Sequence, residues 1–531
     1  MKVKRLLVRI ARNARSLGVA LVFFAAVFVG HQLLISLLGD RKHISEDVYV
    51  EWKPCWLLHS PFGRDEMDCG VLGVPEDHFG TGEGTIELPF VVFRAERRSD
   101  DKRPLVLAGG GGPGNALGLD RYFIGDLVSG VRKMTVENGR DFVAIDNRGV
   151  GSSRPRLRCF EVGRAYRDLL QKGASEDVEV RAVARAYAEC RSKLTRDREI
   201  DVSKFNVLQA AHDLDALRGA LGLTSINVYG VSYGTRVAMF YAREFPGRTE
   251  TLVLDSVFPP HLRSYERYPK SDSDAFARLF SRCAEDVECA NAFGDDLGAR
   301  FEHFLENLDG RAIVTRVRDH ASDSTLQAKL TPAIILTSMF NAMYDEERYY
   351  ELPFIVHRML EGDYVPIRTL VAEQYLASLI DENFDDGAYA SYTCHDERPF
   401  NDVAYALAEA ERHPFQTALN RPYIRSKIAM CEEWAVPAGD QWIALPLQTD
   451  IPAILFSGEL DPGTPAEWAI EAAGYLPNGF QKTLPNTGHD VLAVSICAEE
   501  AAARFLDAPH RNPFLTDCVD SHLSALRFRL Q

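Results

Sequence analysis

The chain has 531 residues, of which 46% are hydrophobic and 26% charged, and its formal net charge is −16. Without low-complexity tracts or an internal repeat, a chain of this length and composition can bury a large interior. Its acidity argues against nucleic acid as a partner.

The amino terminus predicts export. An uncharged, mainly apolar stretch of 22 residues, 17–38, is long enough to span a bilayer, and the six basic residues before it place the first residues in the cytoplasm. No small-x-small cleavage site is obvious. We therefore expect an uncleaved anchor in the inner membrane with the remainder on the periplasmic side; export with a cleaved signal peptide is the alternative. The basic residues are Lys2, Lys4, Arg5, Arg9, Arg12 and Arg15.

Ten cysteines, an even number after an export segment, predict disulfides formed in an oxidising compartment. No C-x-x-C pair and no Cys/His cluster with zinc spacing is present, so we expect no metal. The connectivity cannot be deduced from the sequence, and buried free thiols are the alternative. Pairing neighbours in order keeps each bridge within one part of the chain, with Cys55–Cys69 and Cys283–Cys289 the first candidates.

A β-prone run at 104–108 leads into six residues, 109–114, of which only Pro113 is not glycine. Such a run exposes backbone N–H groups that can face a substrate carbonyl, and Gly111 and Gly112 are the candidate donors. A phosphate-binding loop is the rival interpretation. It fails because no Gly-Lys-Ser/Thr follows and because proline lacks an N–H donor.

The next motif is Gly230-Val-Ser232-Tyr-Gly234. It follows a short strand at 225–229 and precedes apolar residues at helical spacing up to residue 245. This setting predicts a sharp strand-to-helix corner that projects the hydroxyl of Ser232 from the sheet, as the nucleophile of a hydrolase requires. The N–H of Tyr233 would complete an oxyanion hole.

Two further strand-like runs end in candidate catalytic groups. The apolar run 451–456 precedes Asp461, and the stretch 481–484 precedes His489. Catalytic groups of open α/β sheets collect at the carboxyl ends of strands, so we expect both residues on the edge that carries Ser232. The chain order Ser, Asp, His is that of α/β hydrolases and not that of chymotrypsin or subtilisin.

The three residue types imply a division of labour. His489 would take the proton of Ser232, and Asp461 would hold the imidazole tautomer and stabilise the imidazolium. Neighbouring Glu459 and Asp490 are rival candidates for the orienting acid.

The predicted elements define an α/β fold. Helix and strand patterns alternate through 86–257 and 446–506, which indicates a mostly parallel sheet covered on both faces, whereas 260–445 has mainly helical periodicity and is expected to fold over the site as a cap. We divide the chain into an anchor or signal segment, 1–42, a first core part, 43–259, the cap, 260–445, and a second core part, 446–531.

These motifs together resemble a known family. Gly111-Gly-Pro-Gly114 resembles the glycine-proline signature of the prolyl and tripeptidyl aminopeptidase group of serine exopeptidases, and Asp146-Asn-Arg-Gly-Val-Gly-Ser-Ser153 resembles its Asp-Gln-Arg-Gly-x-Gly-x-Ser turn. Residues 457–465 and 488–489 resemble the carboxyl-terminal segment of its tripeptidyl aminopeptidase-like members. Gly110 stands where many members have His, and Asn147 where many have Gln. The resemblance covers roughly 50–520 and implies an α/β-hydrolase fold without a cofactor.

The same resemblance implies a site for the substrate's ammonium group. The segment 392–399 resembles the Cys-x-acidic segment of tripeptidyl aminopeptidase-like members and contains Asp396 and Glu397. A bridge between Cys394 and Cys431 would hold these acids rigidly. Solvation of the two acids, or pairing with Arg398, is the alternative.

Three functions are weighed against one another. The first is a membrane-tethered serine exopeptidase whose partner is a peptide with a free amino terminus. The second is an esterase or lipase, because ester and amide hydrolysis share this machinery, and the third is a non-catalytic binding module. The sequence determines neither the substrate nor the oligomeric state.

Overall fold

The computed structural model describes residues 40–57, 66–80, 84–99, 101–119, 130–308, 311–319, 323–515 and 518–531. The predicted membrane segment, 17–38, lies outside these residues. Among the helices of the described ranges, none combines the length and the apolar character needed to cross a bilayer.

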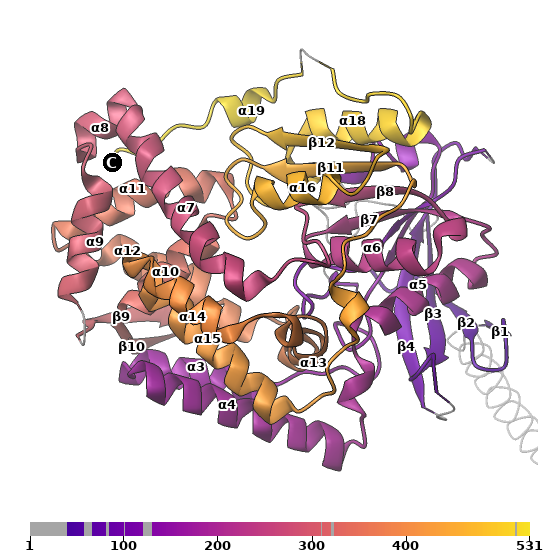
Figure 1. The fold of residues 1–531 in the computed structure, drawn as a ribbon, viewed down its shortest axis with the longest axis horizontal. Coiled ribbons are helices and arrows are strands. Elements are labelled where there is room, and N and C mark those ends of the chain that lie inside the picture. The colour runs from indigo at the N-terminus through magenta and orange to yellow at the C-terminus, as the bar shows by residue number, and fades with distance from the viewer. Residues whose placement is uncertain are drawn as a thin grey trace, which may run out of the picture.

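Within the described ranges, ten strands form one sheet in the order β1-β2-β3-β4-β6-β5-β7-β8-β11-β12 (Figure 1). Strands β1 to β4 pair antiparallel, as does β4 with β6, and β6 to β12 along this order are parallel. The predicted mostly parallel α/β sheet is therefore confirmed. The strands are β1 Asp40–His43, β2 Tyr49–Lys53, β3 Met67–Pro75, β4 Thr85–Phe93, β5 Leu105–Leu107, β6 Phe142–Ile145, β7 Ile226–Val231, β8 Thr249–Asp255, β11 Ala453–Gly458 and β12 Gly479–Leu484.

Helices cover both faces of the parallel strands. On β7, Val228 packs in the core that contains α5 (Val207–Ala220), α6 (Tyr233–Glu244) and α16 (Ala466–Ala473), whereas Tyr229 packs with α18 (Ile496–Asp507) on the other face. This alternation follows from the two-residue period of a strand. Because both faces are buried, β7 and β11 are apolar without interruption by charged residues.

The second body of the molecule is mainly helical and lies beside the sheet (Figure 1). Most of its elements bury a separate hydrophobic core, whereas α13 and the end of α15 pack in a core shared with the sheet. One antiparallel hairpin, β9–β10, interrupts the helices and was not predicted. The elements are α7 Ser264–Glu285, α8 Val287–Phe293, α9 Leu297–Asn307, β9 Ile313–Asp319, β10 Ser324–Leu330, α10 Pro332–Ala342, α11 Glu346–Leu360, α12 Val365–Leu370, α13 Asp386–Asp396, α14 Val403–Glu411 and α15 Pro414–Trp434.

Two helices that precede this interval in sequence also join the helical body. Helices α3 (Phe160–Lys172) and α4 (Glu176–Ser192) lie along its lower edge (Figure 1). Glu176 of α4 forms ion pairs with Arg421 and Arg425 of α15 at 2.7 and 2.6 Å. The helical body is therefore assembled from segments on both sides of β7 in the sequence.

All ten cysteines form disulfides between sequence neighbours, which confirms the expected oxidised state and the two first candidates. The pairs are Cys55–Cys69, Cys159–Cys190, Cys283–Cys289, Cys394–Cys431 and Cys497–Cys518.

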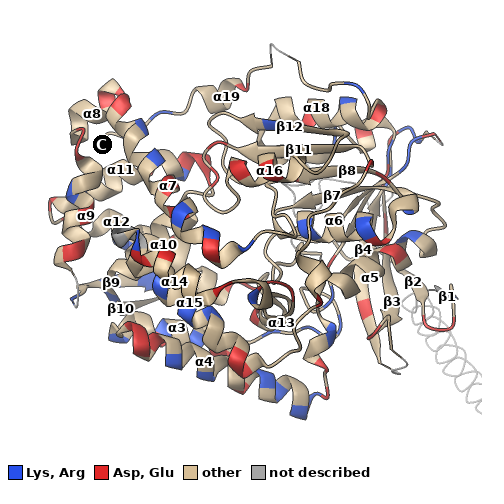
Figure 2. Cartoon of the chain, viewed as in Figure 1, with Lys and Arg blue, Asp and Glu red and all other residues tan. Residues whose placement is uncertain are grey.

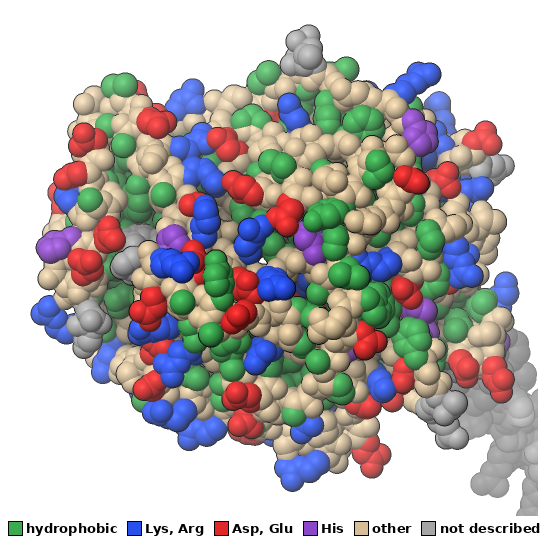
Figure 3. All heavy atoms as spheres, in the orientation of Figure 1, with side chains coloured by type: hydrophobic (Ala, Val, Ile, Leu, Met, Phe, Trp, Pro, Cys, Tyr) green, Lys and Arg blue, Asp and Glu red, His purple; other side chains and the backbone are tan. Residues whose placement is uncertain are grey.

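Charged side chains are spread over the helices of both bodies (Figure 2). On the face drawn in Figure 3, acidic and basic side chains alternate without a large area of one sign. On this face the net negative charge is therefore dispersed.

Candidate active site

Ser232 occupies the corner between β7 and α6. Its backbone has φ 55° and ψ −123°, a region that non-glycine residues rarely adopt. The flanking glycines allow this corner, because a Cβ on Gly230 would lie 2.4 Å from the carbonyl oxygen of Gly234, and a Cβ on Gly234 would lie 2.8 Å from that of Gly109. The predicted strand-to-helix setting is confirmed, and Ser232 remains partly exposed.

Asp461 follows β11 and is fully buried. Its Oδ1 accepts the N–H groups of Gly463 and Thr464 at 2.9 and 3.0 Å, and its Oδ2 accepts the Thr464 hydroxyl at 2.7 Å and Nδ1 of His489 at 2.9 Å. Burial opposes ionisation, but the charge and hydrogen bond of His489 and the bonds from Thr464 outweigh it and lower the pKa of Asp461. The carboxylate is thus held ionised and fixed in orientation.

His489 follows β12 and faces this carboxylate. Burial disfavours its protonation, but the charge of Asp461, their hydrogen bond and the charges of Asp490 and Asp255 together raise the pKa of His489. The ring of Tyr344, from the turn between α10 and α11, lies edge-on to the imidazole with centroids 4.9 Å apart. The helical body therefore reaches the candidate base directly.

The sheet brings Ser232 to the same edge as this pair. β7, β8, β11 and β12 are consecutive parallel neighbours, and their carboxyl ends carry the three candidates. Ser232 N–H donates to the Asp255 carbonyl at 2.9 Å, and the next residue, Ser256, accepts the N–H of Asp490 at 2.9 Å. The end of β8 thus links the serine corner to the histidine loop.

Glu459 and Asp490, the two rival candidates for the orienting acid, do not bind His489 in this way. Oε2 of Glu459 accepts the N–H of Asn486 at 3.0 Å and pairs with Arg282 at 3.1 Å. Oδ1 of Asp490 is buried without a hydrogen-bond partner in the described part of the chain. Among the three acids, it is Asp461 that is hydrogen-bonded to His489.

A second buried carboxyl group lies behind His489. Asp255, at the end of β8, accepts the N–H groups of Val491 and Leu492 at 3.0 and 2.7 Å. Burial, followed by the charge of Asp490, raises the pKa of Asp255 to about 7. These bonds anchor the segment that follows His489.

The glycine loop lies against the serine. A Cβ on Gly111 would be 3.2 Å from Cβ of Ser232 and 3.5 Å from its Oγ, so only glycine leaves room for a substrate there. Gly112 has φ +58°, which favours glycine for conformational reasons. Within the described residues, the N–H groups of Gly111 and Gly112 donate to no other group.

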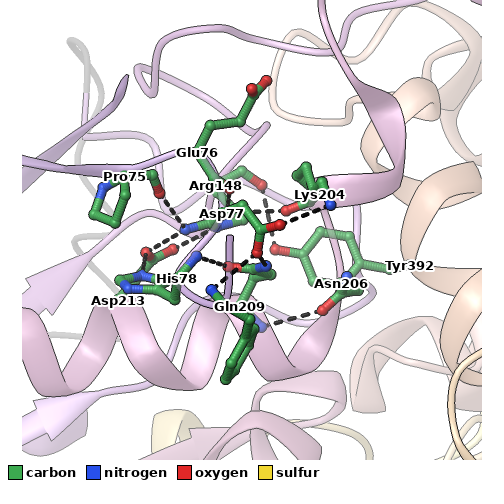
Figure 4. Close-up of polar contacts among 11 residues, drawn as sticks. Pro75, Glu76, Asp77, His78, Arg148, Lys204, Asn206, Gln209, Asp213 and Tyr392 are labelled. Carbon is green, nitrogen blue, oxygen red and sulfur yellow. Dashed lines mark hydrogen bonds and ion pairs between the residues drawn. The ribbon is translucent and has the colours of Figure 1, made fainter. Parts of the chain in front are cut away.

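The turn at 146–153 supports this loop from behind. Asp146 Oδ1 accepts the N–H of Leu117 at 2.7 Å, and the amide of Asn147 fills the space that a Cβ on Gly109 would need. Arg148 is fully buried and donates to Asp213 from Nε at 2.7 Å and from Nη2 (Figure 4). It also donates from Nη1 to the carbonyl of Glu76 at 2.7 Å. Asp146 and Arg148 therefore have structural partners of their own.

The two candidate amine-binding acids differ in their contacts. Asp396 is fully buried; its Oδ2 accepts the N–H of Val207 at 2.9 Å and the hydroxyl of Tyr233 at 3.1 Å, and Nδ1 of His395 lies 2.6 Å from its Oδ1. Both of its oxygens are used inside the fold.

Glu397 has fewer ties. Its Oε2 accepts the hydroxyl of Ser264 at 3.1 Å, and Oε1 lies 3.8 Å from Nη1 of Arg236. Burial raises the pKa of Glu397, although Arg236 and Ser264 act in the opposite direction. Among the described residues, the charge of Glu397 helps to raise the pKa of five tyrosines, namely Tyr233, Tyr265, Tyr268, Tyr389 and Tyr423.

Two residues of the site were missed by sequence analysis. Thr464 lies in the 457–465 motif, and its position three residues after Asp461 in a Pro-Gly turn is a local signal for a hydroxyl that bonds back to the acid. Tyr344 has no such signal, because its contact with His489 arises from tertiary packing.

Two parts of the chain match known protein families. Residues 104–292 match the family described as alpha/beta hydrolase fold, and residues 417–518 match the family described as TAP-like protein. The first range contains the glycine loop and Ser232, and the second contains Asp461 and His489.

Named relatives span most of the chain. Serine protease Hip1 of Mycobacterium tuberculosis (strain CDC 1551 / Oshkosh) is 27% identical over 514 residues, covering 92% of this chain and 94% of that protein. Tripeptidyl aminopeptidase of Streptomyces coelicolor is 25% identical over 446 residues, covering 80% and 76%. Among solved structures, proline iminopeptidase of Mycobacterium smegmatis is 14% identical with a TM-score of 0.36, covering 83% of this chain and 98% of that one.

Proposed function

We propose that the chain is a serine peptidase of the α/β-hydrolase type with a TAP-like carboxyl-terminal segment. In this proposal it cleaves short fragments from the free amino terminus of peptides through an acyl-enzyme on Ser232. The observation that carries the proposal is the 2.9 Å hydrogen bond between His489 and the buried Asp461, on the sheet edge where Ser232 occupies a strained corner.

The proposed chemistry gives each residue of the triad a defined role. Oγ of Ser232 attacks the scissile carbonyl while Nε2 of His489 accepts its proton; the imidazolium then protonates the leaving amine as the C–N bond breaks. Water, deprotonated by the same imidazole, attacks the resulting ester, and the released serine regains its proton. Asp461 holds Nδ1 protonated, so that Nε2 is the basic nitrogen.

The negative charge of the tetrahedral intermediate needs donors. We assign this role to the N–H of Tyr233 together with that of Gly111 or Gly112, since the glycine loop lies against Ser232 and its amides are unoccupied within the described residues. Loss of a single oxyanion donor lowers turnover by about two to three powers of ten in comparable sites.

For the free amino terminus we assign Glu397 rather than Asp396. The oxygens of Asp396 already accept three hydrogen bonds from the fold. Glu397 makes fewer hydrogen bonds, and its Oε1 lies 3.8 Å from Nη1 of Arg236. The ammonium group of a substrate could therefore take the place of Arg236 as the partner of this carboxylate.

The disulfides favour an oxidising compartment, and we extend the proposal to an extracytoplasmic enzyme. Tethering to the inner membrane by residues 17–38 is part of the same proposal and rests on the sequence.

The test is a pair of peptides that differ only by acetylation of the amino terminus. We expect cleavage of the free peptide and a rise in KM or loss of cleavage for the acetylated one. Glu397→Gln should weaken turnover of the free peptide while sparing a small neutral ester. Equal rates on both peptides would exclude the exopeptidase, and hydrolysis of esters alone would leave an esterase.

A further inference from the structure

Lys427, on α15, lies over two aromatic rings and has no ion-pair partner among the described residues. Its Nζ lies 3.6 Å from the ring centroid of Tyr389 and 4.9 Å from that of Tyr423. Within the described residues, Nζ has neither a hydrogen-bond acceptor nor a carboxylate at ion-pair distance. Burial lowers the pKa of Lys427 to about 7, against the opposing charges of Glu397 and Asp386. An ammonium group has three donors, and leaving them unused in such a place is costly.

The lysine is nevertheless in reach of solvent. Its side chain is enclosed by protein and still partly exposed, and the same holds for Tyr389 and Tyr423. Nζ of Lys427 is therefore accessible to solvent and can be approached by a ligand.

A disulfide cross-links the two helices that surround Lys427. The disulfide Cys394–Cys431 joins α13, which carries Tyr389, to α15, which carries Tyr423 and Lys427. The hydroxyl groups of Tyr389 and Tyr423 lie 3.3 Å apart. Nζ is thus held over two aromatic faces, which attract its protonated form although burial lowers the pKa of Lys427 overall.

On one side, aromatic contacts run from Tyr423 to the helix that follows the Asp461 turn. The ring of Tyr423 lies 5.9 Å from that of Tyr268, which lies 5.9 Å from that of Trp468 on the helix after the Asp461 turn. Tyr344 lies edge-on against His489 on this side of the helical body.

On the other side, Tyr389 contacts a residue that packs on the glycine loop. Tyr389 packs on Phe384 with centroids 5.6 Å apart, and a Cβ on Gly114 would lie 3.0 Å from the Phe384 ring. The carbonyl of Gly114 also accepts the N–H of Asp385 at 2.8 Å. Lys427 therefore lies in the part of the helical body that borders both halves of the candidate active site.

We propose that Lys427 binds a carboxylate of the substrate, and that the acidic side chain of an amino-terminal Glu or Asp residue fits best. Glu397 and Lys427 lie close enough to act on each other electrostatically, so an ammonium and a carboxylate of one terminal residue would each meet an opposite charge. This assignment rests on the proposed function for the ammonium half, whereas the carboxylate half depends on Lys427 alone.

The test compares tetrapeptide amides that begin with Glu or Gln. Binding is measured calorimetrically to the Ser232→Ala protein, and kcat/KM is measured with the active enzyme. We expect the Glu peptide to be favoured at least about tenfold, as for a hydrogen bond between charged groups. Lys427→Met should bring the ratio of kcat/KM between the Glu and Gln peptides near one, mainly through a loss for the Glu peptide. Lys427→Arg should restore part of this ratio.

The matched control is Lys270→Met, because Lys270 is an exposed lysine of α7 paired with Asp274. It should leave the ratio unchanged. A Gln peptide with a free carboxyl terminus, compared with its amide, shows whether a terminal carboxylate is the group bound instead, which would overturn the side-chain assignment.

The outcomes separate the two proposals. Lys427-dependent binding of the Glu peptide without cleavage of either peptide would retain the carboxylate site and contradict the exopeptidase. Equal binding and cleavage of both peptides would overturn the carboxylate site and leave the exopeptidase. A parallel loss for both peptides in Lys427→Met, with a lower melting temperature and slower labelling by a fluorophosphonate, would make Lys427 a structural residue and also overturn the proposal.

Discussion

Nδ1 of His489 lies 2.9 Å from Oδ2 of Asp461, and the hydroxyl of Thr464 donates to the same carboxylate oxygen at 2.7 Å. Because Asp461 is ionised and fully buried, it accepts from Nδ1, and Nε2 is left as the basic nitrogen. The orientation of the imidazole is therefore set by a carboxylate that is itself fixed by hydrogen bonds from Gly463 and Thr464.

Removal of any triad member should disable the enzyme. Ser232→Ala and His489→Ala should each lower kcat by several powers of ten, since the residues act as a unit, and Asp461→Ala should cost somewhat less. Steady-state kinetics with circular dichroism as a check of folding measures this. Wild-type rates in Asp461→Ala would contradict its role as the orienting acid and leave Glu459 and Asp490 as the candidates.

Thr464 should contribute through Asp461. Thr464→Val removes one donor to the carboxylate and should lower kcat about tenfold, the value of one charge-assisted hydrogen bond, with little change in KM. Thr464→Ser keeps the hydroxyl and should recover most of the rate. A larger effect on KM than on kcat would point instead to a contact with substrate.

The pH profile should report the raised pKa of His489. The base must be neutral, so kcat/KM should rise with pH through a midpoint above the ordinary value of 6.5. Asp490→Asn removes one of the charges that raise this pKa and should move the midpoint to lower pH. Asp295→Asn, at an exposed position, serves as the control. An unchanged midpoint in Asp490→Asn would contradict this electrostatic account.

Much of this site could be predicted from the sequence because its parts are local. Gly230 and Gly234 flank a serine after an apolar run, and Asp461 and His489 each follow a strand. Since parallel strands end at one edge, these short patterns also imply proximity in space. Such patterns could not predict the hydrogen bond from His489 that distinguishes Asp461 from Glu459.

The remaining features depend on tertiary packing. The interval 364–380 has one helical periodicity but forms α12, a π-helical segment at Val371–Leu376 and a 3-10 turn at Ser378–Ile380. The sequence of β10 does alternate between apolar and polar residues, as a strand does, but this short pattern stands within a mainly helical interval. Asp396 accepts hydrogen bonds from Val207 and Tyr233, which lie far from it in the chain, so no local pattern could predict them.

The disulfides should contribute according to the loops they close. Removing Cys394–Cys431 with paired Cys→Ala changes should cost about 4 kcal/mol of unfolding free energy, and removing Cys283–Cys289 about 2 kcal/mol, because the loops span 37 and 6 residues. Guanidinium unfolding measures both values. Losses of equal size would mean that native-state strain or residual unfolded structure outweighs loop closure.

The acyl-enzyme tests the central claim most directly. A peptide with a free amino terminus is mixed with the enzyme, the reaction is stopped with acid within milliseconds to seconds, and the digest is analysed by mass spectrometry. We predict that the amino-terminal fragment of the substrate is attached through an ester to Ser232, and that the adduct is absent in Ser232→Ala and with the acetylated peptide. An adduct on another residue, or efficient cleavage by Ser232→Ala, would contradict the account.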